Sequence, residues 1–225
     1  MLFQVDHSLL QQVREKIVQQ QIYWLLGGAG SGKSTIAQQL VNQYELTLYD
    51  MDTHIYGSYH ERFTDARHPV NKAWANAENG IAWLLNMDWD EFSSFHKAAL
   101  PEYLDLFSVD LAETTPEKGL LVDGGLWHPA LLTQVLPPAR VVCLATDQTS
   151  ADIWEGSPER RAMKEFFAYF PDPEVSWGKF LDFDARIAAT VREEARSAGI
   201  SFLSRTQADD VGVFAERVAD ALKLA

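Results

Sequence analysis

The feature that most constrains this chain is a glycine-rich stretch at residues 27–35, which reads GGAGSGKST. It fits the pattern G-x-x-x-x-G-K-[ST], with Lys33 and Ser34 in the last two places. An apolar run of strand-forming residues precedes it at 22–26, and apolar residues recur at helical spacing across 36–41. A strand, a glycine loop and a helix in this order predict a loop that wraps around phosphate groups.

Each part of this loop has a physical role in holding a nucleoside triphosphate. Glycines allow backbone N–H groups to point inward at phosphate oxygens, and the helix N-terminus adds partial positive charge. Lys33 is expected to reach the β- and γ-phosphates and to act in catalysis, and the Ser34 hydroxyl to ligate Mg²⁺. The predicted cofactors are therefore ATP and Mg²⁺, bound by Gly28, Ala29, Gly30, Ser31, Gly32, Lys33, Ser34 and Thr35.

Two alternatives to phosphate binding fit this stretch less well. A strand can turn tightly into a helix without any ligand, but a chance match to the whole pattern with these flanks is rare. The dinucleotide fingerprint G-x-G-x-x-G fails, because the sixth position counted from Gly28 is Lys33.

The bulk composition limits the kinds of partner and compartment. The 225 residues carry a net charge of -13 and suit one domain, predicted as 1–225. Such acidity argues against a broad basic surface for nucleic acid or for an anionic membrane. The single cysteine, Cys143, allows no intrachain disulfide, and the N-terminus lacks a basic start followed by an apolar core. We therefore expect a cytoplasmic protein that binds a small-molecule acceptor; the oligomeric state is not indicated.

Short apolar runs alternate with helical stretches along the chain, which predicts an α/β fold. Strands separated by helices imply a mostly parallel five-stranded sheet with helices on both faces, in three layers. Residues 53–118 are too many for a simple crossover and are expected to form a helical insertion on the acceptor side. Residues from about 148 to 175 are expected to form a lid. The predicted strands are 22–26, 46–49, 119–123, 140–145 and 200–203, and other predicted helices are 6–20, 131–136, 148–170, 179–198 and 211–224.

Three aspartates follow predicted strands, at the end of the sheet where ligands bind in such folds. Asp123 ends an apolar strand before two glycines, a usual place for a carboxylate of a Mg²⁺ shell. Asp50 and Asp52 are two residues apart and would face the same way on a continuing strand. We expect Asp50 to support Mg²⁺ and Asp52 to orient or deprotonate an acceptor hydroxyl. The alternatives are a turn-initiating aspartate and a solvated acidic turn.

Four arginines lie in segments that could close over such a site. Arg160 and Arg161 fall in the expected lid, where either could stabilise charge on the transferring phosphoryl group. Alternatively, both arginines are ordinary solvated residues on a helix surface. Arg62 and Arg67 follow the second predicted strand among aromatic residues and could grip a carboxylate or phosphate of the acceptor. The alternative is that those aromatic residues belong to the hydrophobic core and that the two arginines lie on the surface.

Together, GGAGSGKST, the carboxylates of YDMD, the VDGG sequence and the arginine-bearing segment resemble the small-molecule kinase branch of the P-loop proteins. That branch includes shikimate, gluconate, nucleoside and nucleoside monophosphate kinases. The resemblance implies the three-layer P-loop NTPase fold, metal and acceptor roles for Asp50 and Asp52, and acceptor contact at Gly124 and Gly125. It also implies adenine contact in the loop after the last strand, around Arg205 and Thr206.

The sequence departs from shikimate kinases at two points. Leu126 stands where they have a third glycine, and their arginine-then-glutamate motif in the acceptor region is missing. The aromatic, tryptophan-rich insertion would suit a nucleoside or another planar acceptor.

These observations predict an enzyme that transfers a phosphoryl group from ATP, with Mg²⁺, to a hydroxyl of a small-molecule acceptor. A nucleoside monophosphate kinase is one alternative, which arginines in the acceptor pocket would favour. The other is a nucleotide-binding regulatory module that hydrolyses nucleotide slowly; the Asn-Lys-x-Asp guanine signature is missing, which weakens its GTPase form.

Overall fold

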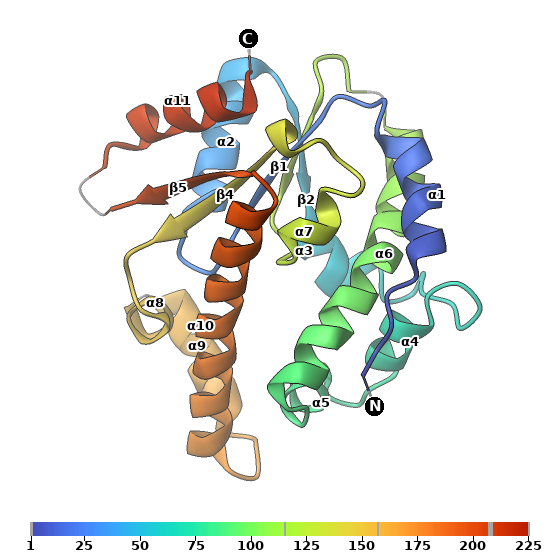
Figure 1. The fold of residues 1–225 in the computed structure, drawn as a ribbon. Coiled ribbons are helices and arrows are strands. Elements are labelled where there is room, and N and C mark those ends of the chain that lie inside the picture. Colours follow the sequence, from blue (N-terminus) through green and yellow to red (C-terminus); the bar gives the residue numbers. More distant parts are fainter. Residues whose placement is uncertain (1, 115, 157, 207–208, 225) are drawn as a thin grey trace.

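The computed structural model describes residues 2–114, 116–156, 158–206 and 209–224. Its centre is one sheet of five strands, all parallel, in the order β2-β3-β1-β4-β5 (Figure 1). The predicted α/β fold with a mostly parallel five-stranded sheet is thereby confirmed. The strands are β1 (Ile22–Gly27), β2 (Thr47–Asp50), β3 (Leu120–Asp123), β4 (Val141–Thr146) and β5 (Ser201–Arg205).

Helices cover both faces of the sheet and extend beyond one end of it (Figure 1). The chain order of the helical elements places α3 to α6 between β2 and β3, and α8 to α10 between β4 and β5. They are α1 (His7–Ile17), α2 (Lys33–Tyr44), α3 (Met51–Thr53), the π-helix η1 (His54–Ser58), α4 (Pro69–Ala75), α5 (Gly80–Leu85), α6 (Trp89–Glu113), α7 (Pro129–Leu132), the 3-10 helix η2 (Pro138–Arg140), α8 (Ser150–Gly156), α9 (Pro158–Phe167), α10 (Pro173–Ser197) and α11 (Val211–Leu222).

The central strand β1 explains the layers, because successive side chains of a strand point to opposite faces. Trp24 and Leu26 belong to an apolar cluster with α1, α6 and α10. Tyr23 and Leu25 belong to a second cluster with α2 and α11. All four side chains are buried, as expected of a parallel sheet that is covered on both faces.

The predicted insertion at 53–118 consists of helices joined by turns and irregular segments, and its described residues contain no strand. Ile55, Tyr59 and Phe63 join the same apolar cluster as Trp24, so the insertion packs directly on the sheet. Its longest helix, α6, begins at a capping box in which Asp88 and Glu91 bind each other's backbone N–H groups. In the part of the chain that the structure describes, no helix combines the length and apolar character that crossing a bilayer requires.

Several helix boundaries differ from those predicted. The helix expected at 179–198 begins earlier, at Pro173, because proline is favoured at the first position of a helix. The helix expected at 131–136 is the short helix α7, which likewise begins at a proline, Pro129, and ends at Leu132. The helical stretch expected at 148–170 forms α8 and α9.

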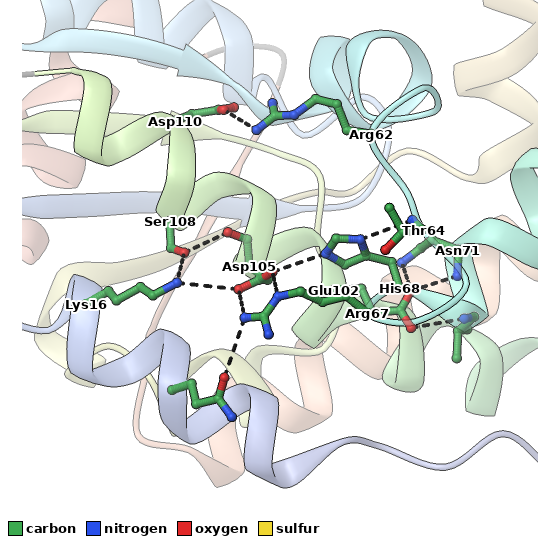
Figure 2. A network of polar contacts seen from close by, with 12 residues as sticks. Lys16, Arg62, Thr64, Arg67, His68, Asn71, Glu102, Asp105, Ser108 and Asp110 are labelled. Atoms are coloured by element: carbon green, nitrogen blue, oxygen red, sulfur yellow. Dashed lines mark hydrogen bonds and ion pairs between the residues drawn. The ribbon is translucent and has the colours of Figure 1, made fainter.

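A buried carboxylate on α6 ties α1 and the segment before α4 to this helix (Figure 2). The Asp105 side chain is 3% exposed. Arg67 binds both of its oxygens, with Nε and Nη2 each 2.6 Å away. His68 donates from Nε2 at 3.1 Å, and Lys16 of α1 lies 3.6 Å away. Because Lys16 comes from α1 and Arg67 from the segment before α4, Asp105 fixes the positions of both segments relative to α6.

A second carboxylate of α6 caps α4. The Glu102 side chain accepts hydrogen bonds from the backbone N–H groups of Val70 and Asn71 and from the Asn71 amide. The first N–H groups of a helix have no partner within the helix, so a carboxylate from a neighbouring helix stabilises this end. Figure 2 shows both carboxylates on the same stretch of α6.

We predict that Asp105→Asn lowers the free energy of unfolding by about 1–3 kcal/mol at neutral pH, because it removes a buried carboxylate that accepts hydrogen bonds from Arg67 and His68. Burial alone would raise the pKa of Asp105, but hydrogen bonds from His68 and Arg67 hold it well below its usual range. The ion pairs therefore stabilise the fold above the ordinary aspartate pKa of about 3.9 and are lost as the pH falls further. Urea unfolding at pH 7 and at about pH 3 measures this free energy for both proteins. The difference between wild type and Asp105→Asn should be smaller at the lower pH.

The matched control is Asp182→Asn, which breaks an exposed pair with Arg186 on α10. It should change the urea midpoint little, since exposed pairs contribute little. An equal loss in both variants would contradict the structural role of Asp105.

Candidate active site

The glycine loop joins the end of β1 to the start of α2, as the sequence pattern predicts. A side chain at Gly27 would not fit, because its Cβ would lie 2.2 Å from the carbonyl oxygen of Leu144 on β4. Gly32 adopts a left-handed conformation, with φ of 82°, immediately before α2. The loop is therefore shaped by backbone contacts that only glycine permits, and it presents the N-terminus of a 12-residue helix.

The Lys33 ammonium group lies over this loop. Its Nζ donates to the carbonyl oxygens of Gly27 at 2.9 Å and Gly28 at 3.2 Å. The buried Ser31 hydroxyl donates to the same Gly28 oxygen at 2.8 Å. The positive charge is thus held above the backbone amides of the loop, which is where phosphate oxygens would bind.

Two carboxylates meet at the ends of neighbouring strands. Asp50 of β2 and Asp123 of β3 lie opposite each other in the strand register. Asp123 is 6% exposed; its Oδ1 has no hydrogen-bond partner among the described residues, and its side chain binds Ser34. Burial raises the pKa of Asp123, against the opposing effects of Ser34 and Lys33. Asp50 instead caps α3 by accepting from the N–H and hydroxyl of Thr53.

Asp52 reaches the same point from the first turn after β2. Its Oδ1 accepts from the backbone N–H of Gly125 at 3.1 Å. A Cβ on Gly124 would lie 2.5 Å from Asp52 Oδ2 and 3.5 Å from Lys33 Cε, so these three residues are in close contact. Burial raises the pKa of Asp52; Lys33 opposes this, and Asp123 adds to it. Lys33, Asp52 and Asp123 therefore form one electrostatically coupled cluster.

The turn that holds Asp52 in place depends on a tryptophan that the motifs did not reveal. The Nε1 of Trp24 donates to the carbonyl oxygen of Gly124 at 2.9 Å, and the bond is buried. Trp24 reads in the sequence as one more apolar residue of a strand. Its polar role depends on β1 lying beside β3, which no local signal contains.

The end of β5 also approaches the loop. A Cβ on Gly32 would lie 3.1 Å from Nη1 of Arg205, whose Nε is buried and has no partner among the described residues. Thr206, the predicted adenine contact, is exposed, and its N–H donates to Asp209 at 2.7 Å. Arg205 is thus a second cation beside the phosphate loop.

The predicted lid arginines lie on α9. The Arg160 guanidinium is 5.7 Å from the ring centre of Trp154 on α8, so it packs within the lid itself. Arg161 is exposed. Their closure over phosphates stays a prediction.

The predicted acceptor arginines are engaged by carboxylates of α6. Arg62 lies 2.7 Å from Asp110, and Arg67 binds Asp105. Neither belongs to the described residues that line the large cavity between the insertion and the lid. The structure brings Lys33, Ser34 and the aspartates together, but it holds these two arginines against α6.

Comparisons with known proteins give similarity at the level of whole structures only. No protein family matches the sequence, and no curated protein matches it. A shikimate kinase from Acinetobacter baumannii, solved in complex with shikimate, is 14% identical, with 93% of this chain and 97% of that chain covered and a TM-score of 0.45. The protein TT1252 from Thermus thermophilus is 16% identical, with 91% and 97% covered and a TM-score of 0.48. A putative kinase from Chloroflexus aurantiacus is 11% identical, with 91% and 98% covered and a TM-score of 0.41.

We predict that Gly124→Ala disturbs this site and the fold together. The φ of Gly124 is +73°, and its new Cβ would collide with Asp52. Unfolding free energy should fall by about 1–3 kcal/mol, and MgATP affinity, measured by calorimetry, should fall because Asp52 is pushed from its place beside Lys33. The control is Gly178→Ala, inside the exposed part of α10, where nothing lies within 4 Å of the new Cβ. It should stabilise the helix by about 0.5–1 kcal/mol; a loss as large as that of Gly124→Ala would refute the geometric argument.

Proposed function

We propose that this protein transfers the γ-phosphoryl group of ATP, with Mg²⁺, to a hydroxyl of a small-molecule acceptor. The observation that carries the proposal is the convergence of three groups at one end of the sheet. Lys33 lies over the phosphate loop, Asp123 holds Ser34, and Asp52 lies against Gly124 beside Lys33. A cation, a metal-binding pair and a carboxylate base are the groups that phosphoryl transfer to an alcohol requires.

The residues present fit Mg²⁺. Asp123 has a buried oxygen without a partner and is hydrogen bonded to the Ser34 hydroxyl, so a cation here would satisfy that oxygen. No group of three or more His, Cys, Asp or Glu side chains among the described residues forms a metal site by itself. This agrees with Mg²⁺, which binds through one or two carboxylates, waters and phosphate oxygens. When bound, the ion would neutralise charge on the β- and γ-phosphates.

Asp52 supplies the base in the proposed reaction. The acceptor oxygen forms a bond to the γ-phosphorus, and the bond between that phosphorus and the β–γ bridging oxygen breaks, which releases ADP. The acceptor's hydroxyl proton passes to Asp52. A pKa raised by burial makes this carboxylate a better proton acceptor than an ordinary aspartate, and Lys33 keeps it charged. Arg205 and the lid arginines would add positive charge near the phosphates.

The engagement of two arginines weighs against the nucleoside monophosphate kinase alternative. A phosphate acceptor needs cations in its pocket. Arg62 and Arg67 are instead paired with Asp110 and Asp105. An alcohol acceptor places no such demand on the pocket.

The test is ADP release from MgATP across nucleosides, nucleotides, sugars, hydroxy acids and aromatic alcohols. We predict that one class stimulates release and that Lys33→Ala abolishes the stimulation, because the γ-phosphate loses its cation. The control is Lys118→Ala, which removes a surface lysine paired with Glu45. Full turnover by Lys33→Ala would remove the proposed function. MgATP binding without stimulation by any class would favour a regulatory nucleotide-binding module.

We also predict that Asp52→Asn lowers kcat by about 10²–10⁴-fold, the usual contribution of a positioned base. In the wild type, kcat/KM should fall on the acid side as Asp52 takes up a proton. Because burial raises its pKa, this fall should lie above the ordinary aspartate value of about 3.9. The pH profile of Asp52→Asn should not show this fall of kcat/KM at acid pH. The profile of Asp65→Asn, a change at an exposed residue, should still show it. An unchanged acid limb in Asp52→Asn would assign the base to another group.

A further inference from the structure

A cavity of about 710 Å³ lies between the insertion and the lid. Its volume is within the range of small-molecule sites. Eight of the eighteen described residues that line it are Phe, Trp or Tyr from separate segments, among them Trp74, Trp127, Trp154, Phe180 and Phe183. In Figure 1 the elements on its two sides, α4 and α5 against α8 to α10, extend beyond the same end of the sheet. Flat apolar rings on opposing sides suit a flat apolar ligand.

The charges around this cavity disfavour an anionic ligand. Glu78 and Asp184 line it, and no lysine or arginine does so among the described residues. Burial lowers the pKa of His96, which also lines it, to about 3, so this imidazole is neutral at physiological pH. Lys179 lies 5.3 Å from the centre of the Phe183 ring and Arg160 lies 5.7 Å from that of Trp154, so both cations pack on aromatic residues of the wall without lining the cavity. An anion placed here would meet two carboxylates, and no cation among the described lining residues would compensate it.

Two polar atoms of cavity residues point to a ligand with some hydrogen-bonding capacity. The Nε1 of Trp154 and the Nε2 of His96 are buried and have no partner among the described residues. A buried polar group without a partner costs about 1–3 kcal/mol, so a ligand atom that meets one of them stabilises the complex. A wholly apolar occupant would leave both unsatisfied.

The cavity adjoins the proposed catalytic groups at two places. Tyr56 lines it and exposes 69% of its surface; Tyr56 follows Asp52 by four residues on the continuous turn of α3 and η1, so both lie on one face. At the other place, Asp184 lines both this cavity and a small pocket of about 80 Å³ formed with Gly28 and Ala29 of the phosphate loop.

We propose that the cavity is the acceptor site and that the acceptor is an aromatic alcohol without negative charge. This rests on the proposed function. The aromatic body lies between the rings of the insertion and the lid, and the hydroxyl lies past Tyr56 at Asp52. Its oxygen forms the bond to the γ-phosphorus, its proton passes to Asp52, and ADP leaves with the bridging oxygen.

Three compounds with one phenylpropyl frame test this, because they differ chiefly in charge. They are 3-phenylpropane-1,2-diol, which is neutral, phenylalaninol, which is a cation, and 3-phenyllactate, which is an anion. Calorimetry without nucleotide should show that the first two bind at least about tenfold more tightly than the anion. The two should also stimulate ADP release from MgATP, whereas 3-phenyllactate, shikimate and gluconate should not.

A pair of variants locates the binding. Phe166 lines the cavity and is 37% exposed, so Phe166→Ala should fold and should weaken binding of 3-phenylpropane-1,2-diol by about 3–10-fold. Tyr169 lies on the same lid, is 88% exposed and does not belong to the cavity wall, so Tyr169→Ala should leave binding unchanged. Thermal melting of both variants checks that each is folded.

Several outcomes would overturn the proposal, and they separate it from the proposed function. Tighter binding of the anion, equal effects of the two variants, or no binding of any of the three compounds would each do so. Competition between adenosine and the diol, sensitive to Phe166→Ala, would assign the cavity to the nucleotide base. If a sugar acid or nucleotide stimulates ADP release that depends on Lys33, the kinase function stands and the aromatic acceptor falls. If the diol binds without turnover and no class of acceptor compound stimulates ADP release, both the aromatic acceptor and the kinase function are refuted.

Discussion

The buried hydrogen bond from Trp24 to the carbonyl oxygen of Gly124 is the contact on which the site depends. Strand β1 leads directly into the phosphate loop, and the same strand orients the turn after β3 through this bond. That turn holds Asp52 through the N–H of Gly125, 3.1 Å away. The positions of the glycine loop and of Asp52 therefore both depend on the central strand β1, and a shift of β1 would move them together.

The parts of the site that follow from sequence are those whose geometry is local. A strand, a glycine loop and a helix place Lys33 and Ser34 with no help from distant residues. Parallel strands end at one edge of the sheet, so Asp50 and Asp123 had to lie near each other, and the register puts them opposite. The number and direction of the strands were predictable for the same reason, because apolar runs alternate with helices along the chain.

The remaining features depend on contacts between distant segments. Arg67 reads as a free cation beside aromatic residues, and only the packing of α6 shows that Asp105 binds it. The aromatic residues of 74–85 have the spacing of a helix that faces a core. Part of that face instead forms a cavity wall, because α8 to α10 lie opposite it without filling the space. Periodicity predicts which side chains face the interior, but not whether other side chains pack against them closely.

The positions of the cations divide this end of the molecule into two environments. Lys33 and Arg205 lie at the glycine loop, whereas Arg62 and Arg67 are paired with carboxylates that hold the first part of the insertion to α6. Positive charge is thus concentrated at the glycine loop, and no lysine or arginine belongs to the described wall of the cavity. In the acceptor site that we propose, selection would come from shape and from a few polar atoms, because no cation lies there to favour an anion. Closure of the proposed lid over it would also exclude water from Asp52, and an apolar acceptor that fills the cavity would strengthen that exclusion.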